Sequence, residues 1–130
     1  MATTVLIAED EAYIVESLTF LLTRAGYEVQ AVADGGEALE SLRRDRPDLF
    51  ILDIMMPTMN GFDVLRKLRG TAGLEDLPVL VLTAKGQEAD RRRMLDLGAN
   101  DFVTKPYANA DLLARVETLL GGGKSSAASA

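Results

Sequence analysis

The chain has 130 residues, 48% of them hydrophobic, which is enough for one compact domain and too short for a second. Its 20 acidic and 14 basic side chains give a net charge of −6, which disfavours direct binding to nucleic acid or to an anionic membrane. The absence of cysteine and histidine excludes disulfides, thiol nucleophiles and thiolate or imidazole metal sites. The opening residues, MATTVLIAED, lack a signal-peptide pattern, so we expect a cytoplasmic protein.

Apolar periodicity predicts alternating strands and helices. Short runs rich in valine, leucine and isoleucine alternate with longer segments in which apolar residues recur every three or four positions. In chain order, we expect a strand at Val5–Ala8, a helix at Tyr13–Arg24, a strand at Glu28–Val32, a helix from Asp34 through Leu42, a strand at Leu49–Leu52, a helix at Gly61–Leu68, a strand at Val79–Leu82, a helix at Glu88–Leu97, a strand at Phe102–Thr104 and a helix at Asp111–Leu120. The order is (βα)5. The first, third and fourth strands are apolar throughout, which predicts a parallel sheet with helices on both faces.

Two local signals mark helix ends. Gly26 stands where the first helix needs a C-cap, and Asp34 with Glu37 has the pattern of a capping box. The segment GGGKSSAASA, residues 121–130, has no apolar periodicity, and we interpret it as a flexible tail or a linker remnant. The expected folded domain is therefore residues 1–120.

Polar residues follow four of the predicted strands at their carboxyl ends. Glu9 and Asp10 follow the first strand, Asp53 the third, Thr83 the fourth and Lys105 the fifth. In open parallel sheets, functional side chains collect just beyond this edge. We therefore expect three acids, one hydroxyl and one ammonium to lie close together.

Each of these residues also has a purely structural interpretation. Acids after the first strand, Glu11 included, place favourable charge at a helix start. Asp53 alone fits an ordinary turn, and Lys105 alone fits a solvated surface charge. Singly, the structural interpretations are favoured. Together they weaken, because independent caps and turns have no reason to collect at the same end of four strands.

Three neighbouring carboxylates need a compensating cation. Two carboxylates about 4 Å apart repel by roughly 4 kcal/mol at an effective dielectric constant of about 20. Mg²⁺ suits such a site, because it binds one or two carboxylates together with phosphate oxygens. Asp53 can then attack a phosphorus atom as an ionised nucleophile, while Lys105 and a hydroxyl share the charge of the transferring group. The pattern thus predicts an aspartyl phosphate at Asp53.

These motifs resemble the receiver domain of a bacterial two-component response regulator over nearly the whole chain. The matching segments are the pair Glu9-Asp10, Asp53 in ILDIMMPTMNGFDVL, Thr83-Ala84 in VLVLTAKG and Lys105-Pro106 in DFVTKPY. The resemblance implies a flavodoxin-like α/β sandwich with strand order 2-1-3-4-5. It also implies a phosphorylation switch that receives its phosphoryl group from a sensor histidine kinase.

The resemblance assigns the metal and phosphorylation roles. Asp53 would be the phosphoacceptor and a Mg²⁺ ligand, and Asp10 would be a direct Mg²⁺ ligand. Glu9 would bind the metal through water, and Met55 would bind it through its backbone carbonyl. Thr83 would contact the phosphoryl group.

Further family features are implied around the fifth strand. Lys105 would contact the phosphoryl group, and its bond to Pro106 would be cis, which an X-Pro amide permits at modest cost. Phe102 stands at the switch-aromatic position, where tyrosine is more usual, and would turn inward as Thr83 moves. The alternative for Phe102 is an ordinary core aromatic.

The surface of the fourth and fifth helices resembles that of receivers attached to winged-helix DNA-binding domains, which dimerise through it. Arg91 would pair with Asp111 of a second subunit and Asp101 with Arg115, each pair twice across a two-fold axis. The alternative is a solvated helix face.

One ion pair of that subfamily is missing. Its positions are occupied here by Asn100 and Gly122, so we expect a weaker dimer that salt loosens further.

Other classes fit less well. A dinucleotide-binding or P-loop domain needs glycines after the first strand, and AEDEAYIVES has none. A haloacid-dehalogenase-like phosphatase needs a second aspartate two residues after the nucleophile, where this chain has Met55. A stand-alone receiver that docks a protein target or relays phosphate remains open, as does a degenerate receiver that works without phosphorylation.

We do not expect this domain to turn over a phosphorylated substrate as an enzyme. Met55 and Lys85 occupy the positions that orient the hydrolytic water in the family, and neither is a good acceptor for it. We therefore expect self-catalysed phosphoryl uptake and slow self-dephosphorylation, with no enzymatic activity beyond these steps.

Overall fold

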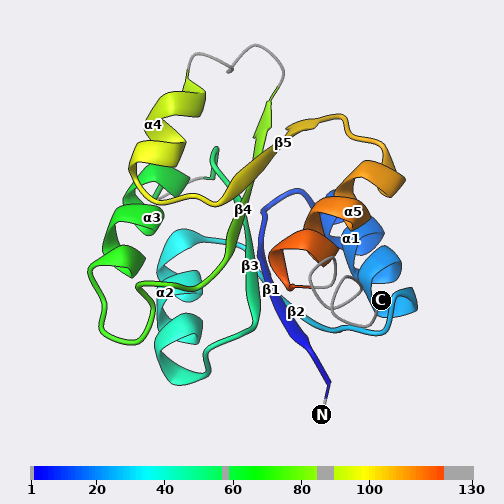
Figure 1. Cartoon of the computed structure of the whole chain (residues 1–130), viewed down its shortest axis with the longest axis horizontal. Helices are drawn as coiled ribbons and strands as arrows, with labels where there is room; N and C mark the ends of the chain where they lie inside the picture. The colour runs from blue at the N-terminus through cyan, green and yellow to red at the C-terminus, as the bar shows by residue number, and fades with distance from the viewer. Residues whose placement is uncertain (1, 57–58, 85–89, 122–130) are drawn as a thin grey trace.

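The computed structural model describes residues 2–56, 59–84 and 90–121, which form a three-layer α/β sandwich (Figure 1). Five parallel strands lie in the order β2-β1-β3-β4-β5, which confirms the predicted fold class and strand order. None of the helices in these ranges is long and apolar enough to cross a membrane. The elements are β1 (Thr4–Ala8), α1 (Ala12–Arg24), β2 (Glu28–Val32), α2 (Gly35–Arg44), β3 (Leu49–Asp53), α3 (Gly61–Arg69), β4 (Val79–Ala84), α4 (Arg91–Asp96), β5 (Asp101–Lys105) and α5 (Asn109–Leu119).

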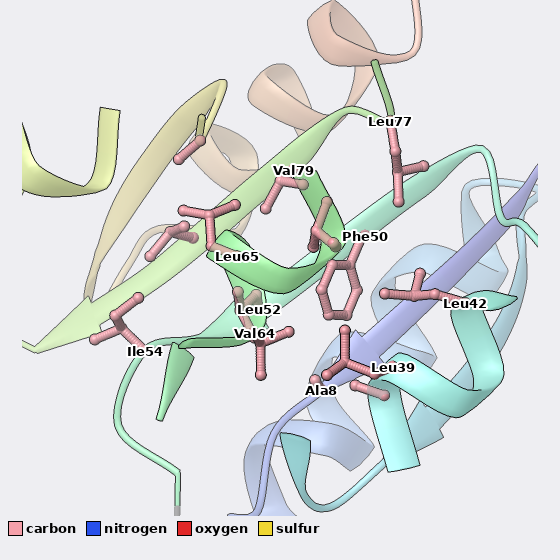
Figure 2. Packing of buried hydrophobic residues seen from close by; sticks show 14 of the residues in the cluster. Ala8, Leu39, Leu42, Phe50, Leu52, Ile54, Val64, Leu65, Leu77 and Val79 are labelled. Atoms are coloured by element: carbon pink, nitrogen blue, oxygen red, sulfur yellow. The ribbon is translucent and has the colours of Figure 1, made fainter. Parts of the chain in front are cut away.

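The sheet separates two apolar layers. Helices α1 and α5 cover one face, and α2, α3 and α4 cover the other (Figure 1). Because side chains alternate along a strand, Leu49 and Ile51 of β3 join the α1–α5 layer, whereas Phe50 and Leu52 join the opposite layer. Figure 2 shows this second layer, with Phe50 and Leu52 among side chains of α2 and α3. All of β3 is buried, so the strand holds Asp53 rigidly at its end.

The predicted helix-end signals are present. Asp34 caps α2, with its Oδ1 accepting a hydrogen bond from the Glu37 N–H at 2.8 Å. The Glu37 carboxylate accepts in turn from the N–H of Ala33 at 3.3 Å, one residue before the cap. Gly26, with a φ of +100°, follows the last turn of α1, where its left-handed conformation ends the helix.

Strands β3, β4 and β5 extend further than the apolar pattern predicts, and they include the polar residues at their ends. Asp53 lies in register with Leu82 of β4, and Lys105 lies in register with Ala84. Pairing continues past the apolar residues because ladder hydrogen bonds join main-chain groups. The sheet itself therefore positions Asp53, Thr83 and Lys105.

Helix α4 has six residues in the described part of the chain, and Met94 is its buried side chain. The predicted start of this helix at Glu88 lies outside the described residues. So do Lys85 and residues 122–130, which include Gly122 and the predicted tail.

Candidate functional site

Lys105 lies among three carboxylates at the carboxyl edge of the sheet. Its Nζ is 3.3 Å from Oε1 of Glu9, 3.4 Å from Oε1 of Glu11 and 3.5 Å from Oδ1 of Asp53. Glu9 follows β1, Glu11 precedes α1 and Asp53 ends β3. The fold therefore joins at one point residues that the sequence places at the ends of three strands.

Three acids at this edge offer a metal site. Carboxylate oxygens of Glu9, Asp10 and Asp53 all lie within 4.8 Å of one another. Glu9 and Asp53 are buried, whereas Asp10 is exposed and opens the cluster to solvent. A hard divalent cation that keeps several of its waters suits such an oxygen donor set, so the residues present fit Mg²⁺.

Main-chain hydrogen bonds orient two of the acids. The N–H of Met55 donates to Oδ1 of Asp53 at 3.1 Å, and the N–H of Glu11 donates to Oε2 of Glu9 at 3.1 Å. Each donor lies two residues after its acceptor, so the local turn restricts the rotamer of each carboxylate. Backbone hydrogen bonds thus orient the carboxylates of Asp53 and Glu9.

The Asn-Gly pair after Asp53 shapes the start of α3. Asn60 caps the helix, its Oδ1 accepting from the N–H of Asp63 at 3.0 Å. The N–H of Gly61 donates to the carbonyl of Ile54 at 2.9 Å, and a Cβ on Gly61 would lie 2.6 Å from Cα of Ile54. Only glycine lets α3 begin this close to the residue that follows Asp53.

The electrostatics of the site favour a cation. Burial raises the pKa of the Glu9 carboxyl to about 7, opposed by the N–H of Glu11 and reinforced by the Asp53 charge. Burial also raises the pKa of Asp53, against the lowering effects of the Met55 N–H and of Lys105. Burial lowers the pKa of Lys105, but Asp53 and Glu9 outweigh it and the net shift is upward. One lysine thus faces more negative charge than it can neutralise.

The predicted switch residues lie on the α4 side of the sheet. Phe102 of β5 is the register partner of Val81 of β4, and both belong to the layer that includes Met94 of α4. Thr83 is buried and follows Val81 by two residues, so strand alternation places it on the same face. Thr83, Phe102 and Met94 of α4 therefore lie on one face of the sheet.

A cleft of about 800 Å³ opens beside Asp53. Its lining includes residues of α1 and of the connection from β5 to α5, where the Lys105–Pro106 bond is cis as predicted. Its lining residues are Asp10, Glu11, Tyr13, Ile14, Ser17, Asp53, Met55, Ala84, Lys105, Pro106, Tyr107 and Asn109.

The side chains predicted to pair across a dimer make contacts within this chain. Nη1 of Arg115 lies 2.8 Å from Oδ1 of Asp101, and its Nε lies 3.2 Å from Oδ1 of Asp111. The guanidinium carbon of Arg91 lies 4.8 Å from the centroid of the Phe102 ring. Part of the predicted interface is thus occupied by intrachain partners.

The contact between Glu11 and Lys105 was not predicted from the sequence. The sequence indicated only that Glu11 would place a favourable negative charge at the start of a helix. Glu11 is the N-cap residue of α1, but its side chain makes no capping hydrogen bond and instead reaches Lys105. The available signal was a third acid directly after Glu9 and Asp10.

The structural role of Asn100 was not predicted from the sequence either. There, Asn100 was noted only because it lacks the negative charge that the winged-helix subfamily uses in its dimer interface. Oδ1 of Asn100 accepts from the N–H of Val79 at 2.8 Å and from Nη2 of Arg69 at 3.0 Å. Asn100 therefore joins the start of β4 to the end of α3.

Comparison with known proteins agrees with this geometry. Residues 5–117 match the family model described as the response regulator receiver domain. The response regulator MprA of Mycobacterium tuberculosis is 45% identical over 120 residues, which are 92% of this chain and 51% of MprA. The chain thus spans about half the length of the curated relatives it matches.

Solved structures share the fold. The receiver domain of a signal transduction histidine kinase from Syntrophus aciditrophicus has a TM-score of 0.86 and 40% identity, with 93% of this chain and 92% of that one covered. The receiver domain of the sensor histidine kinase PA1611 from Pseudomonas aeruginosa has a TM-score of 0.86 and 30% identity, with 93% and 99% covered. That structure contains a magnesium ion coordinated in the active-site cleft. The family match, the identity to MprA and these structures together establish that the chain belongs to the response regulator receiver domain family.

Proposed function

We propose that this domain is a phosphorylation switch that accepts a phosphoryl group on Asp53. The observation that carries the proposal is the position of Lys105, whose ammonium lies 3.5 Å from the buried Asp53 carboxylate. The cluster of Glu9, Asp10 and Asp53 lies beside it. A nucleophilic carboxylate with an ammonium and a metal-binding cluster next to it can stabilise the charge of a transferring phosphoryl group.

The transfer needs no general base. An Oδ atom of Asp53 forms a bond to phosphorus while the bond from phosphorus to an imidazole nitrogen of the kinase histidine breaks. The nitrogen keeps the electron pair, and the product on Asp53 is a mixed carboxylic–phosphoric anhydride. Because an ionised carboxylate is already a nucleophile, the reaction suits a chain without histidine.

Glu9, Asp10 and Asp53, with the backbone carbonyl of Met55, would hold Mg²⁺, which supplies positive charge for the phosphoryl oxygens when bound. Lys105 donates hydrogen bonds to the same oxygens, and the Thr83 hydroxyl donates from the neighbouring strand. The residues of the chain thus orient the group and share its charge.

The proposed output is a change of the surface formed by α4, β5 and α5. The phosphoryl group adds charge and strong acceptors at Asp53, which draws Thr83 toward it and lets Phe102 turn inward. Reversing a 1:99 ratio of two states requires roughly 5.5 kcal/mol, which a few charge-assisted hydrogen bonds can supply. We propose that the changed surface dimerises, with Arg91, Asp101, Asp111 and Arg115 setting the register.

Transcription control in the cytoplasm is the proposed setting. It is supported by the 45% identity to MprA over about half of that protein. Here the domain would be the receiver of a longer regulator, with DNA contacts made outside these residues. A monomeric receiver that docks a protein or relays phosphate is the second candidate, favoured by the likeness to receivers of two histidine kinases.

The phosphorylated state is proposed to be long-lived. Hydrolysis needs a polar side chain that orients water at the anhydride, and the exposed Met55 beside Asp53 offers only a thioether. Met55 also replaces the acid that a haloacid-dehalogenase-like phosphatase would need.

Labelling by a small phosphodonor tests the proposal. Acetyl phosphate with Mg²⁺ should add one acid- and base-labile phosphoryl group to the protein, and chelation of the metal should suppress it. Asp53→Asn should abolish labelling, whereas Asp45→Asn, at an exposed aspartate after α2, should leave it unchanged. Undiminished labelling of Asp53→Asn would refute the assignment.

A further inference from the structure

Glu11 differs from the other two acids that contact Lys105. Its Oε1 lies 3.4 Å from the lysine Nζ, nearly the same distance as Oε1 of Glu9 at 3.3 Å and Oδ1 of Asp53 at 3.5 Å. Glu9 and Asp53 belong to the metal cluster with Asp10, but Glu11 is outside it. Of the three ion-pair partners of Lys105 in the described part of the chain, only Glu11 lies outside this cluster, so its carboxylate would stay available to the lysine when Glu9 and Asp53 hold a cation.

The Glu11 side chain is placed for this contact. It stands at the N-cap of α1, yet it makes no side-chain capping bond to the helix. Its second oxygen, Oε2, accepts from the Tyr13 hydroxyl at 3.4 Å. Its backbone N–H donates to Glu9, so the same residue orients an acid of the metal cluster and contacts the lysine.

Lys105 needs such a restraint. Its side chain is a flexible four-carbon stem, and holding the ammonium in one place costs about 2 kcal/mol of rotamer entropy. The ammonium has three donors, so one can remain on Glu11 while the others reach the phosphoryl oxygens. A partner outside the metal cluster therefore helps to hold the ammonium near Asp53.

We propose that Glu11 is a positioning residue for phosphoryl transfer, acting through Lys105. The inference rests on the proposed function, since it assigns a role within the same reaction. It adds to the proposed site a residue whose carboxylate lies outside the metal cluster and is not the acceptor.

Initial rates of phosphorylation by acetyl phosphate at saturating Mg²⁺ test this role. Glu11→Ala should slow the reaction roughly threefold to fivefold, as fits an ion pair that is partly exposed to water. The affinity for Mg²⁺ should stay within about twofold of that of the parent protein, because the Glu11 carboxylate lies outside the metal cluster. Glu16→Ala is the matched control: it removes the same side chain from an exposed position of α1 and should leave the rate unchanged. If the alanine variant folds poorly, Glu11→Gln replaces it in the same measurement, because glutamine keeps the size of the side chain and removes its charge.

A second measurement separates positioning from a general structural effect. ¹³C relaxation of the Lys105 ε-methylene in the Mg²⁺-loaded protein should report greater mobility in Glu11→Ala and no change in Glu16→Ala. A Glu11→Ala rate equal to that of the parent protein, or a slower rate with unchanged Lys105 mobility, would overturn the inference. Failure of the parent protein itself to take up a phosphoryl group would instead refute the proposed function.

Discussion

Arg115 of α5 binds Asp101 of β5 within one chain, with Nη1 2.8 Å from one carboxylate oxygen and 2.9 Å from the other. Its Nε bonds both oxygens of Asp111 one helical turn earlier, each at 3.2 Å. Pairing across a dimer would therefore exchange intrachain partners for those of a second subunit. Such an exchange gains little charge attraction, so apolar contacts must supply most of the affinity.

The first prediction concerns this exchange. With the phosphoryl mimic beryllofluoride and Mg²⁺, the domain should dimerise, and Arg115→Glu should weaken the dimer by roughly tenfold, because the change acts twice across the two-fold axis. Analytical ultracentrifugation measures both. Arg43→Glu, at an exposed position of α2, is the charge-matched control. A domain that stays monomeric with the mimic bound would favour the protein-docking or relay alternative.

The second prediction concerns Gly61, which lets α3 begin close to Ile54 and Asp53. Gly61→Ala would place a Cβ 2.6 Å from Cα of Ile54 and 3.0 Å from the Asp53 carbonyl. We expect a loss of about 1 to 3 kcal/mol in the free energy of unfolding, as for an overpacked core. Gly70→Ala at the other end of α3 is the control, since its Cβ would meet only ordinary contacts at 3.7 Å. Urea unfolding in which both variants match the parent would contradict the close approach.

The third prediction concerns Arg69, which joins the end of α3 to two loops. It donates to the carbonyl of Leu74 at 2.9 Å, to the carbonyl of Gly98 at 2.6 Å and to Oδ1 of Asn100 at 3.0 Å. Arg69→Met keeps the apolar stem and removes these bonds, which should cost about 2 to 4 kcal/mol. Lys67→Met, at an exposed position of the same helix, should stay within about 0.5 kcal/mol of the parent. Equal urea midpoints for the two variants would exclude a structural role for the Arg69 bonds.

The fourth prediction concerns pH. The folded state raises the pKa of Glu9 from 4.5 to about 7, so between these values it keeps a proton that the unfolded chain has lost. The free energy of unfolding of the metal-free protein should therefore fall as pH rises through this window, by at most about 3 kcal/mol. Urea unfolding in chelator at about pH 5 and about pH 8 measures the fall.

Two controls belong to this pH experiment. Glu9→Gln removes this titrating group and should make the dependence shallower, leaving the part that comes from the raised pKa of Asp53. Mg²⁺ should stabilise the parent protein more at the higher pH, because the cation binds ionised carboxylates. A metal-free protein that gains stability from pH 5 to pH 8 relative to Glu9→Gln would contradict the raised pKa.

The acidic cluster and Lys105 were predictable from the sequence, because apolar runs locate strand ends and parallel strands bring those ends to one edge. That reasoning predicted that Glu9, Asp10, Asp53, Thr83 and Lys105 would lie close together, and the structure brings Glu9, Asp10, Asp53 and Lys105 to one point. Strand lengths were less predictable, since backbone pairing carries β4 on through Ala84 after the apolar run stops.

Contacts that depend on loop conformation could not be predicted. Arg69 donates to the carbonyl of Gly98, which adopts a φ of +110° in the turn before β5, and apolar periodicity does not specify that conformation. The pairing of Asp101 with Arg115 was expected between subunits, because the sequence gives no distance between β5 and α5. Glu11 was indistinguishable from an ordinary acid at a helix start until the position of Lys105 was known.

Phosphorylation of Asp53 can be located chemically, by finding the residue that carries the acyl phosphate. Borohydride reduces a phosphorylated aspartate to homoserine, which tandem mass spectrometry identifies in a peptide. After treatment with acetyl phosphate and Mg²⁺, we expect homoserine at position 53 and unmodified aspartate at position 10. Homoserine at any other position, or an unmodified residue 53 in protein that carries a phosphoryl group, would contradict it.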